Sequence, residues 1–187
     1  MMNQATHFCG GMMWGNEEKG KQTTLCKPLA QLKREHEPLR DKMNAFVRDA
    51  AEIGVSQEIS DWSGQLAALK QKVVAFSREL DPHSEREEGA LFPLMAKYIG
   101  RQMGPIAVME YEHEQAKQNL TTFIEAVEQI EEPVNAGRAK EIVSYALQAH
   151  AILSDHFMKE ENVLFPMAEN LLNAEEKEEL ARAIGLS

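Results

Sequence analysis

Four segments of the sequence place apolar residues at every third or fourth position, the spacing that puts side chains on one face of an α-helix. The apolar stripes cover residues 29–53, 62–98, 106–130 and 142–167. Turn-forming residues separate them at 54–60, 100–105 and 132–137. No segment alternates apolar and polar residues as a half-buried β-strand would. The pattern therefore predicts an all-α fold, an antiparallel up-down-up-down four-helix bundle with short connections.

The two ends of the chain lie outside these stripes. Residues 1–24 contain four glycines and show no period, which predicts an irregular N-terminal arm and assigns residues 25–187 to the bundle. Asn173 followed by Glu176 matches a capping box, so a short C-terminal helix is expected up to about Ile184. Four prolines are each expected to kink or end a helix: Pro38, Pro82, Pro93 and Pro166. The second helix could instead be two helices that meet at Asp81-Pro82. Asp81 would then be the N-cap of the later helix and Pro82 its first residue.

Composition and charge narrow the class of protein. With 43% hydrophobic and 27% charged residues, the 187-residue chain is expected to form one globular domain. It has no apolar run near the ~20 residues of a membrane-spanning helix, and its N-terminus lacks the pattern of a secretion signal. The net charge of −10 includes no basic stripe, so neither nucleic acid nor an anionic membrane is an expected partner. Cys9 and Cys26 are expected to be reduced, in a cytoplasmic protein.

An eleven-residue motif occurs twice, as HSEREEGALFP from His83 and as HFMKEENVLFP from His156, with six identical positions. In each copy the histidine and the glutamate four residues later, Glu87 or Glu160, lie on the same helix face. Both pairs continue an apolar stripe, so they should point into the core. The next glutamate in each copy is rotated by a further ~100° and is expected at a bundle edge or in solvent: Glu88 and Glu161.

His36 and His113 interrupt the apolar stripes of the first and third helices in the same way. A single core histidine is more often a hydrogen-bonded structural residue, but here all four helices agree in phase. Carboxylates and imidazoles that converge in a dry core require a cation, and this donor set suits iron or manganese. The predicted ligands are His36, His83, Glu87, His113, His156 and Glu160.

Other candidate ligands are weaker. His150 lies six residues before His156, about 120° away around the helix, so it is expected at the surface or at a bundle edge. His7 with Cys9 would offer only two ligands in a glycine-rich arm.

Residues 27 to 170 resemble the hemerythrin-like, or HHE cation-binding, family. The resemblance rests on Glu35-His36-Glu37-Pro38-Leu39, on both copies of the repeat and on Glu112-His113-Glu114. It implies a non-haem di-iron site with an oxo or hydroxo bridge, four terminal histidines, and Glu87 and Glu160 as bridging ligands. A ferritin-like site fits less well, because only Glu110-x-x-His113 has its Glu-x-x-His spacing.

One position departs from the oxygen-carrying members of this family. They have a further histidine one turn after the third-helix ligand, where this sequence has Lys117. The departure disfavours an oxygen carrier, and the ligand set is similar to that of di-iron proteins for repair of iron centres. Those proteins usually carry a cysteine-containing N-terminal module, of which only a similar fragment, Cys9-Gly10-Gly11, is expected here. Lys117 could supply a proton or a positive charge to a bound ligand, or simply cover the bundle edge.

Two functions follow as expectations. The first is binding or reduction of O2, NO or peroxide at open iron positions, in oxidative or nitrosative stress. The alternative is an iron sensor or an iron-delivery protein for repair of iron-sulfur centres. A purely structural metal bundle is disfavoured because structural sites tend to be coordinatively closed. The sequence identifies neither an electron donor nor an iron acceptor.

Overall fold

A computed structural model describes residues 23–186. The regular structure in this range is helical throughout, without a strand, which confirms the all-α prediction. Its long helices are α1 (Lys27–Glu52), α2 (Ser63–Arg86), α4 (Pro105–Glu128) and α5 (Ala136–Lys159). Its short elements are the π-helix η1 (Glu87–Leu91), α3 (Phe92–Ile99), the π-helix η2 (Glu160–Leu164), α6 (Phe165–Leu171) and α7 (Ala174–Ala183). The predicted arm lies almost wholly outside the described residues, so the division at residue 24 stays a prediction.

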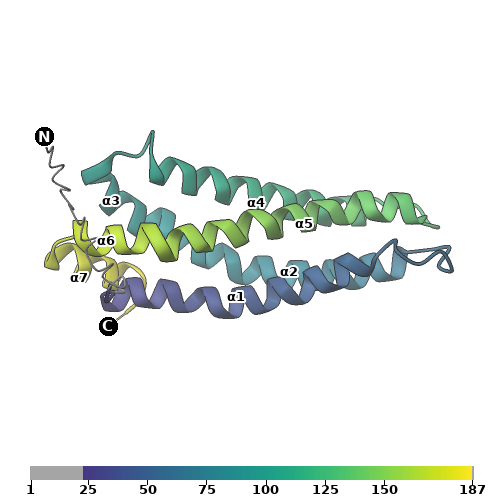
Figure 1. The fold of residues 1–187 in the computed structure, drawn as a ribbon, viewed down its shortest axis with the longest axis horizontal. Helices are drawn as coiled ribbons and strands as arrows, with labels where there is room; N and C mark the ends of the chain where they lie inside the picture. Colours follow the sequence, from purple (N-terminus) through teal and green to yellow (C-terminus); the bar gives the residue numbers. More distant parts are fainter. Residues whose placement is uncertain (1–22, 187) are drawn as a thin grey trace, which may run out of the picture.

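The four long helices lie side by side along the long axis of the molecule, and α3, α6 and α7 gather at one end (Figure 1). Each long helix buries its apolar stripe against the others. None of the helices between residues 23 and 186 has the length and apolar content to cross a membrane.

The core consists of two apolar clusters with a polar layer between them. One cluster begins on one side of the predicted histidines, at Leu39, Leu80, Ala116 and Leu153. The other begins on the opposite side, at Leu32, Leu91, Met109 and Leu164. Every long helix therefore has a histidine between two apolar layers, which keep water away from both sides.

The two π-helices begin at the glutamates of the repeated motif and shift the phase of the helices that follow. A π-turn holds an extra residue, so the buried face moves by one position. Leu164 is 2% exposed and Val163 is 52% exposed, so the predicted stripe was wrong there, as it was at the 46% exposed Tyr98. Pro93 and Pro166 stand at the start of α3 and α6, where a missing N–H and a crowded preceding turn favour the wider π geometry.

The other two prolines do not end a helix. Pro82 lies inside α2, which continues from Ser63 to Arg86, so the possible division after Asp81 is wrong. Pro38 lies inside α1 in the same way. Both proline rings are exposed, and water can therefore bind the backbone carbonyls whose partner N–H is missing.

Side chains fix both ends of the bundle. At one end, Asn173 accepts a hydrogen bond from the N–H of Glu176 at 3.0 Å, and the Glu176 carboxylate accepts one from the N–H of Asn173 at 3.1 Å. This confirms the predicted capping box of the C-terminal helix. At the other end, Asp61 accepts hydrogen bonds from the N–H groups of Ser63 and Val134, which joins two interhelical connections.

Candidate metal centre

Six polar side chains meet in the layer between the two apolar clusters. Each long helix contributes one histidine there, and the two π-helices contribute one glutamate each. None of the six is more than 7% exposed. The structure therefore brings together all the residues that the sequence predicts as ligands: His36, His83, Glu87, His113, His156 and Glu160.

These residues form two groups that share both glutamates. The first group is His36, His83, Glu87 and Glu160, and the second is Glu87, His113, His156 and Glu160. In each group, one potential ligand atom per residue lies within 4.8 Å of all the others. Each group could therefore hold a metal ion, and the two groups adjoin at the shared carboxylates.

The distances show how each glutamate reaches both groups. The two oxygens of Glu160 lie 3.1 Å from His36 Nε2 and 3.2 Å from His156 Nε2. Glu87 Oε2 lies 3.5 Å from the Nε2 atoms of both His83 and His113. Each carboxylate thus approaches one histidine of each group.

Several of these buried atoms have no hydrogen-bond partner within the described part of the chain. They are both oxygens of Glu87, both oxygens of Glu160, and Nε2 of His113 and of His156. Their close approaches lack the direction of a hydrogen bond. Each unpaired buried polar group costs about 1–3 kcal/mol, so the arrangement is unfavourable by itself. Cations between the two groups would remove that cost, and imidazole with carboxylate suits iron or manganese.

The pKa shifts point to the same conclusion. Burial, together with the neighbouring Glu160, raises the pKa of Glu87 well above its ordinary value. Burial alone would raise the pKa of Glu160 too, but His156 and His36 outweigh it and lower that pKa. Without a cation, burial and the charge of Glu160 thus both oppose ionisation of Glu87. Burial lowers the pKa of His83 and His113, which favours the neutral imidazole that binds metals.

A second set of four glutamates surrounds the first and was missed by the sequence reasoning. Each accepts a hydrogen bond from the Nδ1–H of one histidine, which turns Nε2 of that histidine toward the centre. The pairs are Glu161 with His36 at 2.9 Å, Glu35 with His83 at 2.9 Å, Glu88 with His113 at 2.7 Å and Glu112 with His156 at 3.1 Å.

The hydrogen bonds of this outer ring always join neighbouring helices and close a circle around the bundle. Glu88 and Glu161 do lie at bundle edges, as expected, but each also holds a histidine of the next helix. Glu35 pairs in addition with Arg86 at 2.6 Å. Burial would raise the pKa of Glu35, yet the hydrogen bonds from His83 and Arg86 lower it to about 2. The only sequence signal for this ring is that each member adjoins a predicted ligand.

Neither His150 nor Lys117 is among the residues that could hold a metal ion. His150 belongs to neither group, and burial lowers its pKa. Lys117 is exposed beside the bundle edge. His7 and Cys9 lie outside the described residues.

Comparison with known proteins identifies relatives of the chain. The profile of a family described as "Hemerythrin HHE cation binding domain" matches residues 27–168. The "Iron-sulfur cluster repair protein YtfE" of Escherichia coli (strain K12 / DH10B) is 30% identical over 148 residues, which are 75% of this chain and 66% of the relative. The protein of that name from Salmonella schwarzengrund (strain CVM19633) is 29% identical over 137 residues, 72% of this chain and 61% of the relative. The chain thus spans just under two thirds of these relatives' length. No solved structure gives a significant match.

Proposed function

Because the chain belongs to the hemerythrin HHE cation-binding family, we propose that it holds two iron ions and uses them to bind or reduce a small ligand such as O2, NO or peroxide. The observation that carries this proposal is the pair of buried groups that share two glutamates with unpartnered oxygens. Bound iron would supply redox chemistry and direct ligation of the small molecule.

The proposal gives each inner residue a role. His36 and His83 would hold one ion, and His113 and His156 the other. Glu87 and Glu160 would bridge the two ions. Each ion then has fewer protein donors than the six of an octahedral site, so there is room for an oxo or hydroxo bridge and a small ligand. The predicted antiparallel up-down-up-down topology is part of this proposal and is supported by the short connections between the long helices.

The surrounding residues would fix the centre and keep it dry. The outer glutamates hold each imidazole by Nδ1, which sets its tautomer and orientation. The apolar clusters on both sides exclude water, which strengthens electrostatic interactions at the centre. The proposed setting is the cytoplasm, in oxidative or nitrosative stress.

A second candidate function is iron sensing or iron delivery for repair of iron-sulfur centres. The printed name of the relatives, an iron-sulfur cluster repair protein, favours it. Reaction of the reduced protein with NO or peroxide, compared with transfer of iron to an apo iron-sulfur protein, separates the two functions. Rapid transfer without turnover of NO or peroxide would favour delivery.

Metal analysis tests the foundation of both functions. After anaerobic reconstitution with Fe2+ and removal of free metal, the full chain should retain two irons. The double variant His83→Ala/His156→Ala should lose them, while His150→Ala should retain both as a matched control. Less than one iron per wild-type chain, or unchanged iron in the double variant, would contradict the proposal.

A further inference from the structure

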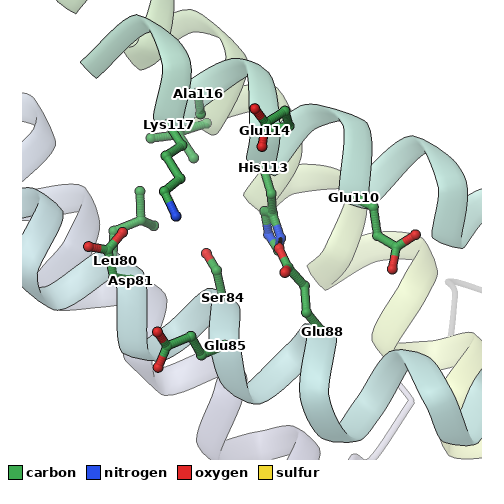
Figure 2. A pocket seen from close by; sticks show the side chains of 11 residues that line it. Leu80, Asp81, Ser84, Glu85, Glu88, Glu110, His113, Glu114, Ala116 and Lys117 are labelled. Carbon is green, nitrogen blue, oxygen red and sulfur yellow. Dashed lines mark hydrogen bonds and ion pairs between the residues drawn. The ribbon is translucent and has the colours of Figure 1, made fainter. Parts of the chain in front are cut away.

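A pocket of about 180 Å³ opens between α2 and α4, next to the metal centre (Figure 2). Its lining includes five carboxylates: Asp81, Glu85, Glu88, Glu110 and Glu114. The other lining residues are Leu80, Ser84, His113, Ala116, Lys117 and Leu153. This space is called the acidic pocket below.

Most of the negative charge in the acidic pocket is uncompensated. Glu110 pairs with Arg101 at 2.7 Å, and Glu88 accepts a hydrogen bond from His113. The other three carboxylates form no ion pair with any residue between 23 and 186: Asp81, Glu85 and Glu114. Lys117 is the only ammonium group in the lining, and Figure 2 shows its amino group pointing into the pocket. A cleft with an excess of one charge raises the local concentration of the opposite ion, here a cation.

The wall of the acidic pocket includes a donor of the metal centre. His113 lines the pocket, is only 7% exposed and has no hydrogen-bond partner at Nε2. The same imidazole belongs to the group formed with Glu87, His156 and Glu160. A cation in the pocket is therefore separated from the centre by a single ligand side chain.

The other openings beside the centre have fewer carboxylates in excess of basic side chains. A pocket of about 150 Å³ at His83 is lined by two carboxylates and one guanidinium, those of Glu35, Glu79 and Arg86, and Arg86 pairs with Glu35. A wider opening at Glu161 is lined by equal numbers of basic and acidic side chains: Lys33, Arg34 and Arg40 with Glu37, Asp41 and Glu161. On the side of His36, the rings of Phe157 and Phe165 stack at 4.3 and 5.6 Å and close off the centre. Neither opening therefore has the excess of negative charge found in the acidic pocket, and the aromatic rings block the approach beside His36.

We propose that the acidic pocket is the route by which a divalent cation, Fe2+, reaches and leaves the metal centre. The inference rests on the proposed function and adds the path of iron exchange that a delivery protein needs. Lys117 acts on this route as a resident positive charge that slows the approach of the metal. Uncharged ligands such as O2 and NO are indifferent to the charge of the pocket.

The rate of metal uptake tests the route. Removal of a carboxylate from the pocket should lower this rate, and removal of the Lys117 charge should raise it. The metal-free full chain is mixed with Co2+ in a stopped-flow instrument, and the d–d absorption of bound cobalt reports binding. At low ionic strength, Glu85→Gln/Glu114→Gln should slow uptake by about threefold or more, and Lys117→Gln should accelerate it about twofold. The control Glu58→Gln/Glu131→Gln removes two exposed charges from the interhelical connections and should keep the wild-type rate.

Four outcomes decide between the explanations. Loss of these rate differences in 0.5 M salt, with two cobalt ions bound at the end in every variant, supports the route. Equal uptake rates in the pocket double variant and its control would overturn it. A lower final cobalt content in the pocket variant would also overturn it, because the glutamates would then be ligands. Less than one cobalt per wild-type chain would instead contradict the proposed function itself.

Discussion

Glu87→Gln should raise the stability of the metal-free chain and lower that of the metal-loaded chain. In the metal-free chain both oxygens of Glu87 are buried without a partner, next to Glu160. Glutamine has nearly the same size and no charge, and its amide can donate a hydrogen bond to Glu160. With metal bound, the same substitution removes a carboxylate from both groups.

The magnitude follows from these contacts. An unpaired buried polar or charged group costs about 1–3 kcal/mol, so the metal-free variant should gain about 2 kcal/mol. For a chain of this length that is a rise in Tm of about 4–8 °C. Bound metal at a thousand times its Kd stabilises the wild type by about 4 kcal/mol, and most of that is lost in the variant. The order of the two stabilities should therefore reverse when metal is added.

The pH dependence has a defined sign. The pKa of Glu87 is raised above its ordinary value of 4.5, so the folded chain binds a proton that the unfolded chain has released. The cost to the metal-free wild type is absent below pH 4.5 and grows as the pH rises toward the raised pKa. The stability gain of Glu87→Gln should consequently be small at pH 4 and large at pH 7.5.

Thermal unfolding followed by circular dichroism measures the Tm of the wild type and of the variant, first with EDTA and then with anaerobic Fe2+. Glu79→Gln is a suitable control, because Glu79 is exposed and, among residues 23–186, forms an ion pair with Lys42 alone. Its Tm should change little in either condition. A lower Tm for metal-free Glu87→Gln than for metal-free wild type would refute the reasoning that the empty centre is strained by its own carboxylates.

Three further predictions concern the frame of the centre. Phe157→Ala removes the ring stacked on His36 at 4.3 Å. It should lower the free energy of unfolding, measured in urea, by about 3–5 kcal/mol. Asn173→Ala removes the cap of α7 and should cost about 1 kcal/mol, or about 2–4 °C in Tm, while Asn173→Ser should retain most of the stability. Backbone N–H groups donate hydrogen bonds to Asp61 and lower its pKa, and the N–H of Val134 has the largest effect. The ionised Asp61 carboxylate thus stabilises the fold above its ordinary pKa of 3.8, and this stabilisation is lost as the pH falls below it. Between pH 5 and pH 2.5, the stability of Asp61→Asn should therefore fall less than that of the wild type.

The inner residues of the candidate site could be predicted from the sequence because helix phase alone determines them. His36 and His113 each occupy a position at which the helical period predicts an apolar residue. The histidine and glutamate of both His-x3-Glu pairs also occupy such positions. A helix that buries its apolar stripe must bury these side chains with it. No knowledge of the packing angle between helices is required, since all four stripes face one core.

The features that escaped prediction depend on contacts between helices or on local departures from helix geometry. The outer glutamates hold histidines of neighbouring helices, and their role depends on which helices adjoin. The π-helices move Leu164 inward and Val163 outward, although the simple period places Val163 in the core. Pro82 remains inside α2 because its ring faces water, which the sequence pattern did not show.

A crystal structure of the iron-loaded chain, with anomalous diffraction recorded at the iron edge, tests the central claim most directly. The account predicts two anomalous peaks, one beside His36 and His83 and one beside His113 and His156. Both ions should contact Glu87 and Glu160. A single peak, or a pair of peaks outside this layer, would contradict the account.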